Sequence, residues 1–156
     1  MGWMVTFVRQ GLLDRSAAGS ASDTLSHEAM PDATAQFATA KYLSVETFRK
    51  SGVGVRTPVW FAADPVVPST FYLYSEADAG KVKRIRNNPR VRVAPCDIRG
   101  KVQGAWVDAH ARICQGAEAT KGQELLKSKY GLMKRIGDFF SRLRGRTHTI
   151  LAIHLD

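Results

Sequence analysis

A short basic segment, GKVKRIRN at residues 80–87, holds the side chains of this sequence that are best suited to bind an anion. Asp78 stands where it can cap a helix, and the first amides of that helix then point outward, where the helix dipole favours a negative charge. Lys81 adds a full positive charge, and Arg84 falls on the same helical face. The spacing therefore predicts a phosphate-binding site at the start of a short helix.

Strand-like stretches flank this basic segment on both sides. FYLY at 71–74 combines aromatic and aliphatic residues, and Val91 and Val93 alternate with arginines. Val82 and Ile85 form an apolar face that can anchor the helix in a core. The same pattern is typical of a solvated basic helix that binds nothing, so the local sequence leaves both interpretations open.

The whole chain has an ordinary globular composition and a strong positive charge. Its 156 residues are 44% apolar and 24% charged, and the net charge is +9. A single domain of this size buries about two thirds of its unfolded surface without disulfides or metals. The charge suits an anionic partner, whether nucleic acid, a membrane surface or a phosphorylated or carboxylated small molecule, and does not choose among them.

The cysteines and the hydropathy indicate a cytoplasmic protein. Cys96 and Cys114 form no CxxC pair, and each is expected as a buried, reduced thiol. Zinc-ligand spacings are missing, so no metal site is expected. No apolar run approaches the about 20 residues of a membrane span, and the start of the chain is too interrupted for a secretory signal.

The order of expected elements predicts a mainly β protein. Residues 1–30 read as a loose N-terminal extension, and 31–156 read as one folded domain. Strands are expected over 42–48, 55–62, 71–74, 90–93, 106–113 and 147–155, and helices over 31–41, 80–88, 117–130 and 132–143. Mostly hairpin connections between these strands favour an antiparallel β-barrel with helices at its ends.

The strand expected over 55–62 contains a proline. Pro58 removes a backbone donor, which places it at a sheet edge or where the ladder is interrupted, and such interruptions often face a ligand. Trp60 lies on the same face of this strand. Plain core or dimer packing explains Trp60 equally well.

Three segments together resemble a known family: GVRTPVWF, LYSEADAGKVKRIRNNPRVRVAPCD and GAWVDAHARI. They are similar to the split β-barrel flavin and deazaflavin oxidoreductases, the group named after pyridoxamine 5′-phosphate oxidase. The resemblance extends from Phe37 to Leu155 and is greatest to the branch that depends on the deazaflavin coenzyme F420. It implies a Greek-key split β-barrel that forms a homodimer, with the cofactor in a groove where the two subunits meet.

The resemblance also implies cofactor-binding residues in two groups. Those for the ring are Thr57, Pro58, Val59 and Trp60, and those for the phosphate are Ser75, Gly80, Lys81 and Arg84. Relatives often carry a hydroxyl residue where Ala79 stands and a basic residue where Asn87 stands, so one phosphate hydrogen bond is expected either to be missing or to come from Ser75. The chain also lacks the Arg-rich closing segment of true pyridoxamine phosphate oxidases, and that activity is not expected.

The expected function is that of an F420-dependent reductase that passes hydride from the reduced coenzyme to an organic acceptor. The cofactor carries such a reaction, so no catalytic residue is expected from the protein. FMN in the same site is the first alternative, and a non-catalytic carrier of a flavin-like or tetrapyrrole ligand is the second. Tyr72 and Tyr74 near the arginines also suit a barrel for single-stranded nucleic acid, although nucleic acid is not the expected partner.

Overall fold

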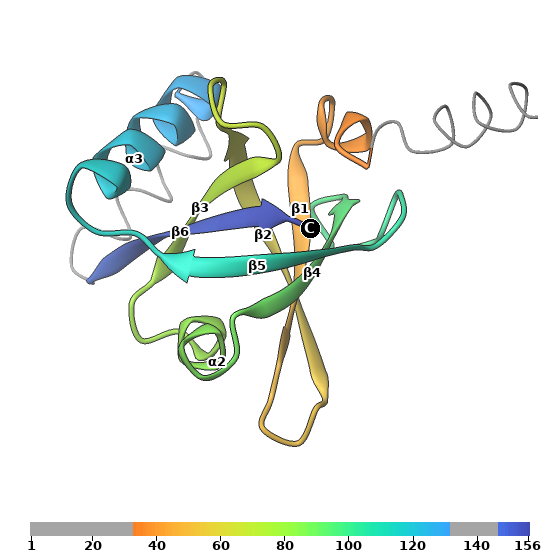
Figure 1. Ribbon diagram of the computed structural model, residues 1–156. Helices are drawn as coiled ribbons and strands as arrows, with labels where there is room; N and C mark the ends of the chain where they lie inside the picture. The colour runs from red at the N-terminus through yellow and green to blue at the C-terminus, as the bar shows by residue number, and fades with distance from the viewer. Residues whose placement is uncertain (1–32, 132–146) are drawn as a thin grey trace, which may run out of the picture. The chain divides into compact units, whose positions relative to one another are not determined.

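Six antiparallel strands close into a barrel in the computed structural model, which describes residues 33–131 and 147–156 (Figure 1). The strands are β1 (Tyr42–Phe48), β2 (Gly54–Ala63), β3 (Thr70–Glu76), β4 (Arg90–Cys96), β5 (Val107–Ile113) and β6 (His148–Leu155). The helices are η1 (Ala35–Phe37), α2 (Gly80–Asn87) and α3 (Gly116–Tyr130). Around the barrel the order is β1-β2-β3-β6-β5-β4, so β4 returns beside β1 and β6 returns beside β3. The predicted mainly β antiparallel barrel is confirmed.

One face of every strand fills the interior of the barrel. This interior cluster contains Phe37, Leu43, Val45, Val59, Phe61, Phe71, Leu73, Val82, Ile85, Val91, Val93, Ala109, Ala111, Leu151, Ile153 and Leu155. Within each strand these residues are two apart, as the pleat of a strand requires. The strands expected over 55–62 and 106–113 are therefore confirmed, and each buries alternate residues in this cluster.

A second apolar cluster lies outside the barrel, where α3 packs on β2, β3 and β6. Its buried members are Ala62, Tyr72, Tyr74, Cys114, Leu126, Tyr130, Ile150 and Ala152. Because β3 and β6 bury both of their faces, the central residues of each strand, 71–74 and 150–153, form an unbroken aromatic and aliphatic run. Gly122 allows the close approach of α3, since a methyl group there would lie 2.7 Å from Cγ2 of Ile150 and 2.8 Å from Cδ1 of Tyr72.

The helix α2 covers a different side of the barrel from α3 (Figure 1). Its Val82 and Ile85 are buried in the interior cluster, which confirms the predicted apolar face. The polar face of α2, with Lys81 and Arg84, is consequently directed away from the core interior.

The start of α2 differs from the prediction. The N-cap is Ala79 instead of Asp78, and no side chain in the described part of the chain caps the helix. The amide of Ala79 donates to the carbonyl of Glu76 at 3.1 Å, so the turn after β3 delays the helix until Gly80. The predicted Asp78 cap is therefore wrong.

The last residue of α3 ties that helix to the ends of β1 and β2. The hydroxyl oxygen of Tyr130 lies 3.1 Å from the amide nitrogen of Phe61, 2.7 Å from the carbonyl oxygen of Phe61 and 2.8 Å from that of Lys41. The hydroxyl accepts from the amide and donates to one of the two carbonyls. It thus satisfies backbone groups at the point where the β1–β2 ladder ends.

We expect Tyr130→Phe to lower the free energy of unfolding by about 1–2 kcal/mol, because the substitution leaves the buried Phe61 amide without its acceptor. Urea denaturation measures the difference. Tyr42→Phe is the matched control, since Tyr42 is only half-buried. Equal stability of Tyr130→Phe and the native chain would contradict the bridging role of the hydroxyl.

Some elements are shorter than expected, and others fall outside the residues that the structure describes. The helix expected over 31–41 is limited to the single turn of η1, because the chain enters β1 at Tyr42. The expected extension at 1–30 and the expected helix at 132–143 lie outside the described residues. No helix within 33–131 or 147–156 is long and apolar enough to cross a membrane.

Candidate functional site

The strands β2 and β3 separate after a short ladder. They pair only from Phe61↔Leu73 to Ala63↔Phe71, whereas β2 pairs with β1 continuously over 54–60. Among the described residues, no strand pairs with the other side of this 54–60 stretch. Pro58 lies within the unpaired stretch, which confirms the prediction that it marks an interruption of the ladder.

A cleft of about 250 Å³ opens where β2 leaves β3. Its lining consists of Tyr42, Pro58, Val59, Trp60, Tyr74, Lys81 and Ile98. Tyr42 pairs with Trp60 across the β1–β2 ladder, and Tyr74 comes from β3. The walls are therefore aromatic and aliphatic, and Lys81 from α2 is the charged member of the lining.

Lys81 is half-buried in the first turn of α2. Burial lowers the pKa of its ammonium, the charge of Arg84 lowers it further, and Glu76 acts in the opposite direction. A cation that has lost part of its hydration gains more from an anion than a fully solvated cation does. The end of the cleft at Lys81 is thus suited to an anionic group.

Arg84 and Gly80 lie beside the cleft and do not line it. The Arg84 Nε donates to the Thr47 hydroxyl at 2.7 Å, which directs this side chain toward β1. Its guanidinium folds back over the helix start, where a Cβ at Gly80 would lie 2.9 Å from Nη1. Burial and the nearby Arg49 both lower the pKa of Arg84. Gly80 therefore makes room for the Arg84 side chain.

Ser75 and Thr57 also lie outside the cleft lining. Ser75 is buried on the interior face of β3, and its hydroxyl donates to the carbonyl of Glu76 at 3.1 Å. Thr57 is half-buried on the face of β2 that also carries Val59. Of the eight predicted cofactor-binding residues, the cleft brings together Pro58, Val59, Trp60 and Lys81.

Sequence reasoning missed three members of the lining. Tyr42 could have been found, because the turn over 49–54 fixes the register that places it opposite Trp60. Tyr74 was predicted only as a strand residue that, with Tyr72, would also suit base stacking in the nucleic-acid alternative. Ile98 is 52% exposed in the loop between β4 and β5, and nothing in its local sequence signals a site.

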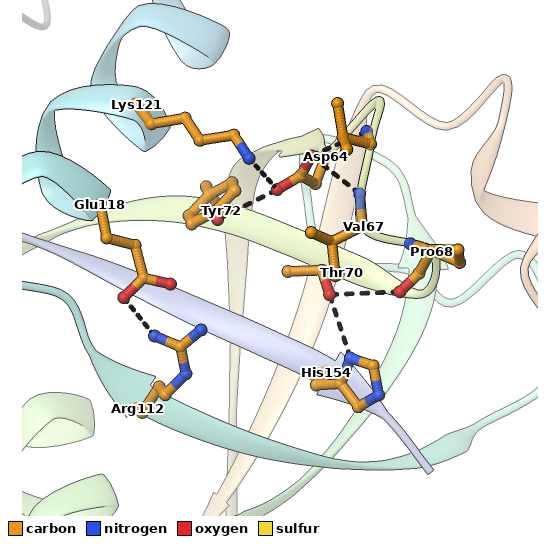
Figure 2. A network of polar contacts seen from close by, with 10 residues as sticks. Asp64, Val67, Pro68, Thr70, Tyr72, Arg112, Glu118, Lys121 and His154 are labelled. Atoms are coloured by element: carbon orange, nitrogen blue, oxygen red, sulfur yellow. Dashed lines mark hydrogen bonds and ion pairs between the residues drawn. The ribbon is translucent and has the colours of Figure 1, made fainter.

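A buried carboxylate organises the loop that joins β2 to β3 (Figure 2). Asp64 accepts hydrogen bonds from Lys121 Nζ at 2.7 Å, the Tyr72 hydroxyl at 3.1 Å and the amides of Val66 and Val67 at 2.9 and 3.1 Å. Burial acts to raise the pKa of this carboxyl, but these four hydrogen bonds together lower it to about 2. The network holds the loop against α3.

Trp106 and His110 lie away from the cleft. Trp106 stacks under the guanidinium groups of Arg56 and Arg92, at 4.7 and 5.5 Å from the ring centroid, and both arginines pair with the buried Glu46. His110 is exposed on the outer face of β5 and bonds to the Asp156 carboxylate. Neither side chain lines the cleft.

The two cysteines are buried free thiols. Burial raises the pKa of each to about 11, with Asp97 acting in the same direction on Cys96 and Glu118 on Cys114. Such thiols are unreactive at neutral pH. In the described residues, no group of three or more His, Cys, Asp or Glu side chains is placed to hold a metal ion.

Solved structures share this fold, although no protein-family model and no curated protein matches the sequence. The heme-storage protein HutZ of Vibrio cholerae aligns with a TM-score of 0.56 over 81% of this chain and 89% of its own, at 13% identity. An FAD-binding protein of Mesorhizobium loti gives 0.54 over 79% and 84%, at 17% identity. A candidate pyridoxamine 5′-phosphate oxidase of Listeria innocua gives 0.54 over 78% and 89%, at 12% identity. The chain thus shares the split β-barrel fold of these three proteins.

Proposed function

We propose that this protein is an F420-dependent oxidoreductase that binds the deazaflavin ring in the cleft between β2 and β3 and transfers hydride between the reduced coenzyme and an organic acceptor. The observation that carries the proposal is the combination of aromatic and aliphatic walls with one half-buried cation, Lys81. A flat ring with an anionic group at one end matches this combination.

The open side of β2 supports binding of the ring through the backbone. Pro58 has no N–H and stands in an uninterrupted ladder with β1, so its nitrogen faces the open side. A flat ring can therefore lie close to this side of β2, while the side chains of Tyr42 and Tyr74 pack beside it.

The lining provides no acid–base pair of its own. Among the described residues that form the cleft, there is no carboxylate, histidine or thiol. Burial raises the pKa of Tyr74, so this phenol stays protonated at neutral pH. The bound deazaflavin would supply the hydride chemistry, and the residues of this chain would bind it, orient it and exclude water.

The size of the cleft supports a second subunit at the site. Its volume of about 250 Å³ falls below the about 300–1,000 Å³ that is common for small-molecule pockets. Ile98 at its rim is 52% exposed. A homodimer in which the partner covers this rim would complete the site and bury Ile98. Exposed cations on α2, such as Lys83 and Arg86, would attract the anionic coenzyme to the same opening.

An FMN-dependent oxidoreductase is the second candidate, because a flavin phosphate would use Lys81 in the same way. Titrating the purified chain with F420 and with FMN at fixed salt, followed by tryptophan fluorescence, separates the two, since Trp60 lines the cleft. Selective binding of F420 supports the first candidate, and preference for FMN supports the second. Binding of neither would overturn both and favour a carrier of another ligand.

We expect Lys81→Ala to weaken coenzyme binding about tenfold or more, because it removes a charge-assisted hydrogen bond. Lys83→Ala is the matched control: it removes the same charge from an exposed position of the same helix, outside the cleft. We expect less than about a twofold change for this control, through long-range attraction alone. Equal affinities of the Lys81 variant and the native chain would remove the phosphate assignment.

A further inference from the structure

A second hollow, of about 480 Å³, lies between η1, the β2–β3 loop and α3. It shares no lining residue with the cleft between β2 and β3. Its floor is the outer edge of three buried phenylalanines, Phe37, Phe61 and Phe71. The rings of Phe37 and Phe61 both meet Phe71 edge to face, with centroids 5.1 and 5.3 Å apart. The floor is therefore apolar and rigid.

A cation stands at the rim of this hollow. The Nζ of Lys129 lies 3.8 Å from the centroid of the Phe61 ring. It donates to the carbonyl of Phe61 at 2.8 Å and to that of Ala40 at 3.3 Å. An ammonium group has three donors, so these two carbonyls leave one for a further acceptor.

The charge of Lys129 is not balanced locally. None of the ion pairs within the described ranges involves this side chain. Asp64 also lines the hollow, but its carboxylate is fully buried and pairs with Lys121. Lys129 is exposed overall, but partial burial of its ammonium group lowers its pKa to about 8. The hollow thus offers one positive charge beside an apolar floor.

We propose that this hollow is a binding site for a small apolar monocarboxylate, with the carboxylate on Lys129 and the hydrocarbon body over the phenylalanine floor. The volume of about 480 Å³ falls in the range of about 300–1,000 Å³ that suits small-molecule ligands. The site is independent of the proposed coenzyme site, so either assignment can fail without the other.

The test uses phenylpropionate as the probe and its amide as the uncharged analogue. The methyl groups of Ala38, Ala62 and Ala63 report on the hollow because all three line it. In the full chain with labelled alanine methyl groups, NMR titration should shift these three signals saturably. We expect the acid to bind about tenfold more tightly than the amide, because only the acid forms the charge-assisted contact.

Four variants distinguish the site from a general surface effect. Lys129→Met should reduce the affinity for the acid to that for the amide. Lys129→Arg keeps the positive charge and should retain most of the affinity for the acid. This second variant provides the test if Lys129→Met is poorly folded. Lys127→Met is the matched control, since Lys127 is exposed on the same helix and does not line the hollow. Ala38→Trp should abolish binding by filling the hollow.

Several outcomes would overturn the proposal. One is equal affinity for the acid and the amide. Another is unchanged binding in the folded Lys129→Met variant, and a third is the absence of saturable shifts at millimolar probe. Loss of phenylpropionate binding in Lys81→Ala would place the probe in the other cleft and would overturn it as well.

Discussion

Replacing Asp64 with Ala should lower the free energy of unfolding by about 3–5 kcal/mol. The substitution removes an acceptor whose side chain is completely buried and which serves Lys121, Tyr72 and two backbone amides. Tyr72 is itself buried, so its hydroxyl would lose its partner without gaining water. Urea denaturation at neutral pH measures the loss.

Asp97→Ala is the matched control for this prediction. The Asp97 carboxylate also accepts from two backbone amides, those of Arg99 and Lys101, each at 2.9 Å. It lies in an exposed loop and pairs with no cation in the described structure. We expect a loss of only about 1 kcal/mol there. Equal losses in the two variants would show that burial and Lys121 do not matter.

The same Asp64 variant should also change the pH dependence of stability. The pKa of Asp64 falls from its ordinary 3.8 to about 2 in the folded chain, because burial is outweighed by the hydrogen bonds from Lys121 and the loop amides. The folded-state pKa lies below the unfolded one, so the stabilisation is fully present above pH 4 and is lost as the pH falls toward 2. The native chain should lose about 2 kcal/mol more over this interval than Asp64→Ala does.

Replacing Gly122 with Leu should destabilise the protein by about 3 kcal/mol. Even one methyl group at this position would lie within 3 Å of Ile150 and Tyr72, and both of these side chains are buried. Gly122→Ala tests whether helix propensity or close packing has the larger effect on stability at this position. Helix propensity alone favours alanine by about 1 kcal/mol, whereas the close packing of α3 predicts a net loss. Lys127→Leu, at an exposed position of α3, should change stability by less than about 0.5 kcal/mol. A stabilised Gly122→Ala variant would contradict the packing described for α3.

Local sequence pattern predicted which segments form strands and helices better than it predicted which strands pair with one another. The alternation of Val55, Val59 and Phe61 and the turn before them were enough to place β2 and its burial. The pairings β1–β4 and β3–β6 join segments far apart in the chain, and no short-range pattern specifies them. The sequence therefore predicted an antiparallel barrel, and the resemblance implied a Greek-key split barrel, but the order of the strands around it was not predicted.

Whether a residue lies at the cleft was predicted better where the backbone determines its position than where the direction of its side chain does. Pro58 has no N–H to donate to a neighbouring strand, so its place on the side of β2 that faces the cleft could be inferred. Arg84 was assigned to the phosphate by helical spacing, but the Thr47 hydroxyl directs its guanidinium toward β1. Ser75 faces inward because of the parity of β3, which depends on the whole strand. The roles of all these residues in cofactor binding stay predictions.

The short ladder between β2 and β3 also affects how the protein behaves at high concentration. A strand with one unpaired side is a template on which the strand of another molecule can add, and such addition leads to aggregates. Pro58 stands in the middle of this side and offers no N–H to an incoming strand, and the neighbouring Arg56 places a charge beside it. The proline that lines the cleft therefore also protects the barrel against edge-to-edge polymerisation.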